Sequence, residues 1–574
     1  MRVRGSSALC AAVICVLAVG VPEAASGSRM QPASSFAASS HTTRLTAVGG
    51  KADDDFGYAG VAVAGDIAVV AAIERAVAGH TQQGMAYVFR RPDSGWAHAK
   101  QVAVLSASDG GAEDNFGLGV ATDGSTIVVA APGHTIGSQG FAGAVYVFSK
   151  PAGGWSGSLH QSAELRPSAP VAEGEWGYRS VAVAGRTVVV GDPAAAVAGH
   201  TGQGEALVYT EPQHGWSKVI TRPTATLTAT DGAAQDALGY SSIAVSGSTI
   251  VAGAGGHDVG LNADQGASYV FTRPAAGWSG VRHESAELTA TDGAAEDQLG
   301  GFATAISGRT VVASSGFHEV GTNAQQGEAY VFTEPASGWS GARHESARLL
   351  ASDGTAGDYL GLGPIVISGD IVATASPYHV VNGVHDAGTV YLYQKPSRGW
   401  SGTRLESAER VATGPQSGDS LGYGDLAISG TTLIAGTDGH DVGANAGQGA
   451  AYVFSPARPA LSRLATSTHS FAARSRATVV DPAHPHKGGL RLSFTLQGQQ
   501  ATVSLAIARR GHGHHAAVGT VTVSAPQGRD RVYFFGRLSA RRVLRPGSYT
   551  IAVFASSASG VSKHHVEHVT VVRS

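Results

Sequence analysis

Cysteine is almost absent from this sequence of 574 residues, which contains only Cys10 and Cys15. Both lie in an apolar run, residues 8–21, that follows two arginines and precedes a group of small residues. This order is typical of a cleavable secretory signal, whereas a membrane anchor, the alternative, needs about 20 apolar residues. The pattern predicts a Sec-type signal peptide over residues 1–28 and a mature chain without disulfides.

Charge and long apolar runs are also scarce. Only 14% of the residues are charged, against about 25% in typical soluble domains. No stretch after the signal peptide is long enough to cross a bilayer. We therefore expect no transmembrane segment in the mature chain and an extracellular or cell-envelope location. Residues 29–41 are expected to form a flexible N-terminal segment.

Glycine is abundant, with 79 residues, and it marks an internal repeat. Near-copies of residues 286–313 recur along the chain, at steps of 60, 60, 62, 61, 61 and 61 residues. A constant period is typical of one repeat architecture rather than of separate domains. A glycine that follows an aromatic residue or a leucine aligns the seven copies, at Gly57, Gly117, Gly177, Gly239, Gly300, Gly361 and Gly422.

Each period contains four segments with strand character, and no helical periodicity is present. In the copy at Gly239 the segments are residues 242–246, 249–254, 267–271 and 284–289. The first alternates between polar and apolar residues, and the second is almost continuously apolar, as expected for a strand buried on both faces. Four antiparallel strands in each of seven periods predict an all-β fold, a seven-bladed β-propeller over residues 42–455.

The two ends of the repeat region predict how the ring closes. Residues 42–47 match only the fourth strand of a period, and residues 451–454 match only the third. Pairing them would complete the last blade from both ends of the chain and would remove an exposed strand edge.

Three motifs recur in a fixed order: L-x-A-x-D-G-x-x-x-D-x-[FL]-G, V-A-[VI]-x-G-x-T-[VI]-V-x-[GA]-A and Q-G-x-A-Y-V-F. Together they resemble the bacterial FG-GAP repeat, which is related to the propeller of integrin α subunits. The resemblance covers about residues 42–455. It implies a secreted or cell-surface propeller that works in adhesion or ligand binding.

The calcium loops of that family are missing. Integrin-type repeats hold calcium in D-x-D-x-D-G loops between the first two strands. Here the connections are two-residue turns, such as Gly185-Arg186, Gly308-Arg309 and Gly430-Thr431. So short a turn cannot supply the six to eight oxygen ligands of calcium. No cofactor is therefore predicted, and a divalent cation bound elsewhere stays an alternative.

One face of the propeller is expected to collect polar residues. A histidine follows the second strand of each copy, and four of the blade-to-blade loops carry paired acids. Such groups could bind a divalent metal or an ionic ligand, but the favoured interpretation is structural, with Asp closing turns and His bonding backbone. The candidates are His80, His134, His200, His257, His318, His379, His440, Asp109, Asp114, Asp231, Asp236, Asp292, Asp297, Asp353 and Asp358.

The opposite face carries a Gly-Trp corner in six copies. Exposed tryptophans could stack on sugars, but we expect each ring to pack against its neighbours. The residues are Trp96, Trp155, Trp216, Trp278, Trp339 and Trp400.

The chain changes character after Phe454. Residues 456–487 are rich in Pro, Ala, Ser and Arg and are predicted to be a linker. Residues 488–574 contain six alternating segments, which predict a β-sandwich. The run 544–562 resembles immunoglobulin-like modules that end many exported actinobacterial proteins.

Charge separates the two parts of the chain. Residues 455–574 hold 16 Lys+Arg and 3 Asp+Glu, a net charge of +13, and the remaining 24 and 40 give −16. A basic module on an acidic propeller could bind an anionic cell-wall polymer or dock on the propeller. A nucleic-acid partner is not expected for an exported protein.

No nucleophile elbow, phosphate loop or zinc-helix signature is present. The predicted function is therefore non-enzymatic binding of an extracellular protein or glycan at the bacterial envelope. Two alternatives stay open: a secreted carbohydrate-active or phosphodiesterase-type hydrolase, and a structural envelope protein.

Overall fold

The computed structural model describes residues 40–573, except 457–459, 481–485, 498–500, 511–514 and 558–559. The predicted signal peptide, residues 1–28, lies outside the described residues, and so does nearly all of the segment 29–41. Within the described ranges the chain is almost entirely strands, turns and loops, with one short 3-10 helix, η1 (Trp96–His98). The predicted all-β class is confirmed.

The sheet formed by the copy at Gly239 shows how each repeat folds. It consists of β16 (Ile243–Ser246), β17 (Thr249–Ala254), β18 (Ala267–Thr272) and β20 (Ala286–Thr289), in that order and antiparallel. Most of β17 is buried, in agreement with its continuous apolar run. A two-residue turn joins β16 to β17, and Gly247 adopts φ 59° there, a conformation that favours glycine in tight hairpins.

The repeats form seven such sheets between Ser40 and Pro456, and we number these blades 1–7 by the order of their aligning glycines. Blade 1 consists of β2 (Phe56–Ala64), β3 (Ile67–Ala72), β4 (Met85–Arg90) and β5 (Lys100–Leu105). Blade 2 consists of β6 (Gly119–Thr122), β7 (Thr126–Ala131), β8 (Ala144–Ser149) and β10 (Ala163–Leu165). Blade 3 consists of β11 (Val181–Ala184), β12 (Thr187–Asp192), β13 (Glu205–Thr210) and β15 (Ala225–Thr228). Blade 4 is the sheet described above. Blade 5 consists of β21 (Thr304–Ser307), β22 (Thr310–Ser315), β23 (Glu328–Thr333) and β25 (Ala347–Leu350), and blade 6 of β26 (Ile365–Ser368), β27 (Ile371–Ser376), β28 (Thr389–Gln394) and β30 (Ala408–Arg410). Blade 7 consists of β31 (Leu426–Ser429), β32 (Thr432–Thr437), β33 (Ala450–Pro456) and β1 (Ser40–Leu45).

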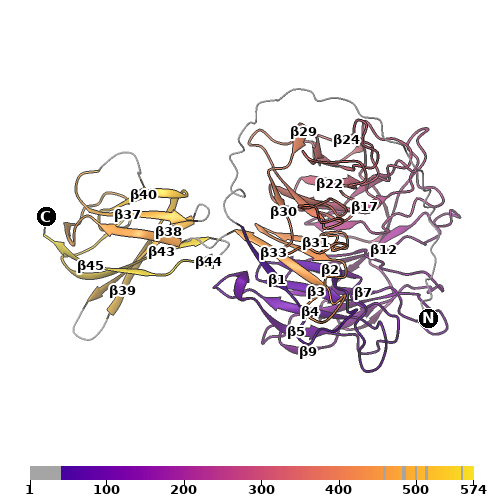
Figure 1. Cartoon of the computed structure of the whole chain (residues 1–574), viewed down its shortest axis with the longest axis horizontal. Coiled ribbons are helices and arrows are strands. Elements are labelled where there is room, and N and C mark those ends of the chain that lie inside the picture. The colour runs from indigo at the N-terminus through magenta and orange to yellow at the C-terminus, as the bar shows by residue number, and fades with distance from the viewer. Residues whose placement is uncertain are drawn as a thin grey trace. The chain divides into compact units, whose positions relative to one another are not determined.

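The sheets close into a ring. Each blade's first strand packs against the first strand of the next blade, and β31 of blade 7 packs against β2 of blade 1. Strand β1 pairs antiparallel with β33, so that Leu45 lies opposite Ala451. Figure 1 shows indigo β1 beside orange β33. The predicted closure of the last blade by both ends of the repeat region is therefore present.

A fifth strand joins five of the sheets and was not predicted. In five of the six copies with a Gly-Trp corner, the segment after the corner pairs in parallel with the outer strand of the preceding blade, as Gly280 pairs with Ala225. Neighbouring blades are thereby linked by hydrogen bonds at the outer edge as well as by packing. These strands are β9 (Gly157–Leu159), β14 (Lys218–Ile220), β19 (Gly280–His283), β24 (Gly341–His344) and β29 (Gly402–Leu405).

The aligning glycine has a physical cause that Gly300 illustrates. Its φ is 74° and its N–H donates to the carbonyl of Ser314 at 2.9 Å. A Cβ at this position would lie 2.3 Å from the Ser268 hydroxyl. Both the backbone conformation and the space require glycine.

The C-terminal part contains two sheets. One has the order β34 (Ala460–Thr466), β37 (Leu490–Gln497), β40 (Gly528–Phe534) and β36 (Val479–Val480). The other has β35 (Ser470–Ala472), β45 (His565–Val572), β43 (Gly547–Ser557), β38 (Ala501–Arg510) and β39 (His515–Ala525), and β44 (Gly560–Val561) pairs with β43. A small hairpin of β41 (Arg537–Ser539) and β42 (Arg542–Val543) completes the part. The two sheets share one apolar core; the immunoglobulin-like classification stays a prediction.

The linker prediction for residues 456–487 is wrong for much of that segment. Strands β34, β35 and β36 lie in it and pair with the C-terminal sheets. Leu461 and Phe471 are buried in the shared core. The composition of the segment, rich in Pro, Ser and Arg, hid these few apolar anchors.

No helix within the described ranges is long and apolar enough to span a membrane.

Candidate functional site

Five of the predicted histidines form a repeated pair with a buried aspartate. In blade 4, Asp236 Oδ2 accepts the N–H of Ala233 at 2.9 Å and bonds His257 Nδ1 at 2.8 Å. The pair joins the blade-to-blade loop to the loop that follows the second strand. The same contact, at 2.8–3.0 Å, links His134 to Asp114, His318 to Asp297, His379 to Asp358 and His440 to Asp419.

His80 and His200 do not occupy that position, so the seven histidines are not equivalent. Each lies in a small bridge with Val77 or Val197, where blade 4 has Asn262. Their Nδ1 atoms contact backbone carbonyls of the next loop, at 2.9 Å in each case. These two histidines are the ones that bond backbone, as the structural interpretation expected.

Blades 1 and 3 show what replaces the pair. In blade 1, Arg75 stands at the histidine position and its Nη1 contacts Asp54 Oδ2 at 2.7 Å. In blade 3, Ala195 and Gly174 stand at the two positions. In blade 1 the aspartate is kept and pairs with arginine instead of histidine, whereas in blade 3 both members of the pair are absent.

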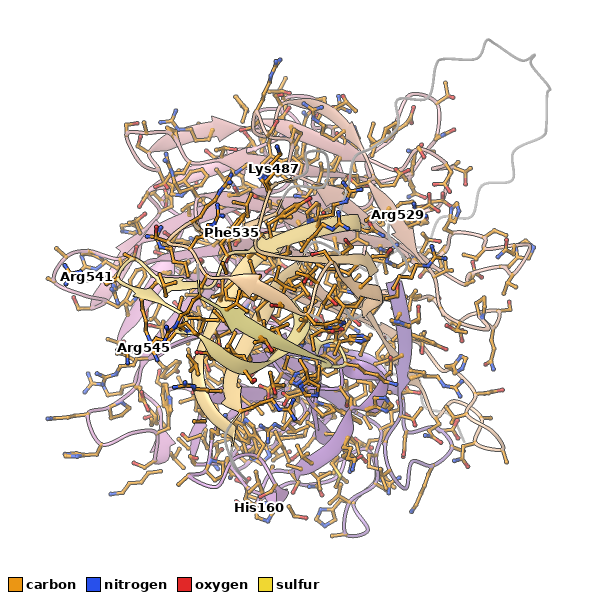
Figure 2. All side chains as sticks on the ribbon, turned by 90° about the vertical axis from the view of Figure 1, so that its left-hand side faces the viewer. His160, Lys487, Arg529, Phe535, Arg541 and Arg545 are labelled. Atoms are coloured by element: carbon orange, nitrogen blue, oxygen red, sulfur yellow. The ribbon has the colours of Figure 1, made fainter. Side chains whose placement is uncertain are left out.

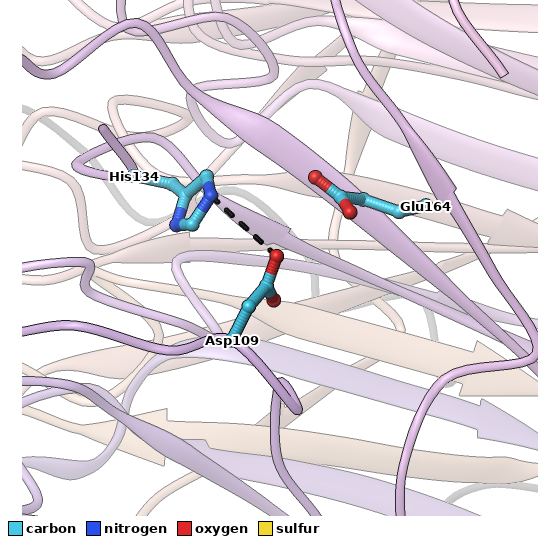
Figure 3. A group of neighbouring side chains, drawn as sticks. All are labelled: Asp109, His134 and Glu164. Atoms are coloured by element: carbon cyan, nitrogen blue, oxygen red, sulfur yellow. Dashed lines mark ion pairs between the residues drawn. The ribbon is translucent and has the colours of Figure 1, made fainter. Parts of the chain in front are cut away.

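The first acid of each Asp-Gly step lies on the other side of the histidine. Asp231 Oδ1 accepts the hydroxyl of Tyr269 at 3.0 Å, and Oδ2 lies 3.9 Å from His257 Nε2. In blades 2, 5 and 6 the corresponding distances from Nε2 to the acid are 3.9, 3.7 and 3.4 Å, for Asp109, Asp292 and Asp353. Figure 3 shows the blade 2 group, in which His134 faces Asp109 and Glu164. Each of these histidines therefore lies between two acids.

The acids dominate the electrostatics of the histidines. Burial alone would lower the pKa of His257, but the hydrogen bond with Asp236 and the charges of Asp236, Asp231 and Glu287 outweigh it and raise the pKa. The pKa values of His134, His318 and His379 are raised by equivalent acids.

These pairs predict a pH dependence of stability. A histidine with a raised pKa in the folded state stabilises that state below its unfolded pKa, about 6.5, and the contribution is lost as pH rises through the folded pKa. We expect the free energy of unfolding, measured with urea, to fall between pH 6 and pH 8.5. Asp236→Asn should weaken this dependence of the free energy of unfolding on pH. A free energy of unfolding that rises from pH 6 to pH 8.5 would contradict the stabilising role of the His–Asp pairs.

The six tryptophans of the Gly-Trp corners are 2–8% exposed. Trp96 Nε1 donates to Thr432 Oγ1 at 3.2 Å, and Trp155 Nε1 donates to the carbonyl of Gly124 at 3.3 Å. These rings pack inside the propeller and offer no stacking surface to a sugar.

A feature that the sequence interpretation missed is a set of aromatic rings around one end of the central cavity. The cavity has a volume of about 240 Å³ and is lined by first-strand residues of several blades, with Phe302, Tyr423 and Arg179. Phe317 and Tyr378 directly precede His318 and His379, which places the rings on the face of the His–Asp pairs. We name the set the aromatic arc: Tyr58, Tyr178, Tyr240, Phe302, Phe317, Tyr359, Tyr378 and Tyr423.

Six rings of the aromatic arc form a continuous chain. Successive centroids, from Phe302 through Phe317, Tyr359, Tyr378 and Tyr423 to Tyr58, are 5.5, 5.9, 5.6, 6.0 and 6.2 Å apart. Tyr178 and Tyr240 stack at 5.4 Å, and Tyr240 is 40% exposed. The other seven rings are partly buried. Their spacing is in the range of favourable aromatic contacts.

Charged groups accompany the aromatic arc. Arg179 lies over the Tyr58 ring, 5.2 Å from its centroid, and donates from Nη1 to the carbonyl of Gly424 in blade 7 at 3.1 Å. Burial, together with neighbouring carboxylates, raises the pKa of Asp55 to about 7. Burial also raises the pKa of Asp438, although Arg179 opposes the shift. The arc therefore offers apolar faces, the Arg179 cation and two carboxyl groups with raised pKa values.

One sequence signal could have revealed the aromatic arc. The residue after the aligning glycine is tyrosine in four copies, at Tyr58, Tyr178, Tyr240 and Tyr423. The ring places these positions together at the start of the first strands.

The closed ring of repeated antiparallel sheets makes this chain a β-propeller protein. Four of its repeats match the FG-GAP repeat family, over residues 40–89, 99–148, 222–271 and 283–332. The predicted resemblance is confirmed for these four copies, and those at Gly177, Gly361 and Gly422 lie outside the matched residues. A search of curated protein sequences found no match.

Solved structures with a distant likeness include three bacterial or insect proteins. The periplasmic gluconolactonase of Pseudomonas aeruginosa is 12% identical, with a TM-score of 0.25, over 64% of this chain and 92% of that protein. PorZ, a surface component of the type-IX secretion system of Porphyromonas gingivalis, is 9% identical with a TM-score of 0.15, over 90% and 75%. The GH32 β-fructofuranosidase of Bombyx mori is 9% identical with a TM-score of 0.22, over 79% and 85%. These low scores assign neither fold nor function.

Proposed function

We propose that the mature protein is a secreted or cell-surface bacterial propeller that binds an extracellular glycan or protein without transforming it. The observation that carries the proposal is the aromatic arc. Ligand sites are concave and mostly apolar, with aromatic walls and a few polar groups that fix orientation. The end of the central cavity has this composition, with Phe302, Tyr423 and Arg179 at its wall.

The His–Asp pairs support this placement of the site indirectly. In each pair, the histidine Nδ1 and the aspartate carboxylate form a contact between two loops. Such pairs hold the loops on the face of the aromatic arc in place, so the rings are preorganised. A preorganised site binds with a smaller loss of conformational entropy.

A binding experiment with two tyrosine variants tests the proposal. Ligands would be selected on glycan and peptide arrays with the protein from residue 29 onward, and their affinities measured for Tyr240→Ala and Tyr423→Ala. We expect each variant to bind at least about tenfold more weakly, because an aromatic anchor typically contributes 1.4 kcal/mol or more.

Leu405→Ala provides the matched control, since Leu405 lies on the outer strand β29 and is 56% exposed. It should bind like the parent. Equal affinities of the parent and both tyrosine variants would place the site elsewhere. An array without any bound ligand would favour a structural envelope protein.

The basic C-terminal part supports a second contact with the envelope. Lys487, Arg529, Arg541 and Arg545 are exposed, and in Figure 2 Arg541 and Arg545 lie near each other, away from Arg529. We propose that this part binds an anionic cell-wall polymer, an attraction that salt would screen. If the full chain sediments with cell walls equally well at low and high salt, this proposal is wrong.

A hydrolase is the second candidate, and a pair of acids in blade 3 favours it. Asp192 and Glu205 lie opposite each other on β12 and β13. Burial raises the pKa of Asp192 to about 6, and burial with the charge of Asp192 raises that of Glu205 to about 7. Such pKa values suit general acid–base catalysis at neutral pH. Glycoside and phosphodiester substrates, tested with the parent and Glu205→Gln, would reveal it; no difference between the two would exclude this pair.

A further inference from the structure

We propose that blade 4 contains a binding site for a divalent transition-metal ion, formed by His257 Nε2, Asp231 and Glu287. The three side chains come from the loop after β17, the loop before the first strand and the outer strand β20. One ligand atom from each lies within 4.8 Å of the others. Both contacts from Nε2, to Asp231 Oδ2 and to Glu287 Oε1, are 3.9 Å.

The burial and hydrogen bonding of His257 support the metal site first. Its side chain is 10% exposed, and Nδ1 is already engaged by Asp236 at 2.8 Å. Nε2 has no hydrogen-bond partner within the described residues, because 3.9 Å exceeds the 2.7–3.2 Å of such bonds. A carboxylate on one ring nitrogen, with the other nitrogen aimed at further ligands, is the arrangement of metal-binding histidines.

The size of the site is the second argument. A triangle with edges of 3.9–4.8 Å has its centre about 2.3–2.8 Å from each corner, and zinc lies about 2.0–2.2 Å from nitrogen and carboxylate ligands. Small side-chain rotations close that difference. Asp231 is 46% exposed, which leaves an entry path for an ion.

Blades 2 and 5 provide the third argument, because their acids have arginine partners. In blade 2, Arg166 contacts Glu164, and its Nη2 lies 3.2 Å from Asp109. In blade 5, Arg348 contacts Glu328, and its Nη2 lies 2.8 Å from Asp292.

In blade 4, Thr289 stands where blade 2 has Arg166, and Glu287 stands where blade 5 has Arg348. Converging carboxylates in a partly buried site need a cation. Blade 4 supplies no arginine there.

The ligand set indicates the class of ion. Imidazole with carboxylates suits zinc, iron, nickel and copper, whereas calcium and magnesium prefer oxygen ligands alone. The other charged groups near Glu287 are Glu284 and His344. Zinc is the probe of choice because it has no redox chemistry.

Equilibrium dialysis against Zn²⁺ with metal quantification tests the site. The parent protein would start at residue 29 and carry alanine at His512, His514 and His515, so that this histidine-rich run does not contribute. We expect Glu287→Gln to bind one zinc ion fewer than the parent, or to bind it at least about tenfold more weakly. Asp231→Asn, at an exposed position, should give the same loss if Glu287→Gln fails to fold.

The matched control is Asp292→Asn in blade 5, where Arg348 stands at the position of Glu287 and contacts Asp292. The zinc binding of this variant should equal that of the parent. Equal zinc stoichiometry and affinity in the parent and both blade 4 variants would overturn the proposal. Binding of calcium but not zinc at blade 4 would also overturn it.

Discussion

A chain that starts at residue 48, and therefore lacks β1, is expected to lose the cooperative unfolding of the propeller and to aggregate. The deletion removes Leu45 and Ala47, both buried in the core between blades 7 and 1. It also leaves β33 as an unpaired edge, and such edges promote pairing between molecules. Size-exclusion chromatography and thermal unfolding monitored by circular dichroism would measure the effect.

The control for this deletion is a chain that starts at residue 40 and keeps the whole of β1. It should be monomeric and unfold in one transition of the propeller. If the shorter chain proved equally stable and monomeric, the ring would not depend on its first strand.

Gly266→Ala is expected to destabilise the propeller by about 3 kcal/mol or more. Gly266 precedes β18, and its φ is 80°. A Cβ there would lie 2.4 Å from the backbone nitrogen of Leu299 and 2.5 Å from its carbonyl oxygen. Backbone strain and the displacement of a packed loop each cost about 1–3 kcal/mol. Urea unfolding of the two proteins would give the difference.

Gly247→Ala separates these two costs. Gly247 also has a positive φ, 59°, but a Cβ there would meet nothing within 4 Å. We expect a loss of only about 1 kcal/mol from strain. If both variants lost the same stability, the close approach of the loop at Leu299 would carry no cost.

The ring of blades could be predicted from the sequence because the blades arise from a periodic repeat. A constant step of about 61 residues and four strand-like segments per step leave few alternatives to a propeller. The partial matches at 42–47 and 451–454 also predicted which strands complete the last blade, and β1 pairs with β33 accordingly. The fifth strands were not predictable in this way, because their parallel partners lie 54 or 55 residues earlier, as Gly157 with Ala103 and Gly280 with Ala225 show.

The candidate site was predicted only in part. His257 follows the end of β17 by three residues, whereas His80 follows the end of β3 by eight. Counting from the strand end would have separated His80 and His200 from the other five. The sequence prediction aligned the histidines by residue type alone and therefore treated the positions three and eight residues after the strand as one.

The aromatic arc could not be deduced from spacing within one repeat. Tyr423 follows an aligning glycine, whereas Tyr378 precedes a histidine after the second strand of another blade. Their centroids, 6.0 Å apart, meet because the ring brings neighbouring blades together. The ligands of the metal site proposed for blade 4 all lie in one repeat, but on three separate segments that only the folded blade brings together.

The aromatic arc exists as a surface only if the ring is closed, and closure depends on the pairing of β1 with β33. His41 lies opposite Ser455 in this pair, where side chains directly opposite are close enough for a disulfide. The measurement is the count of free thiols in His41→Cys/Ser455→Cys, made in the chain from residue 29 onward, after oxidation. We expect no free thiol and a melting temperature that falls on reduction; two free thiols would show that β1 does not pair with β33.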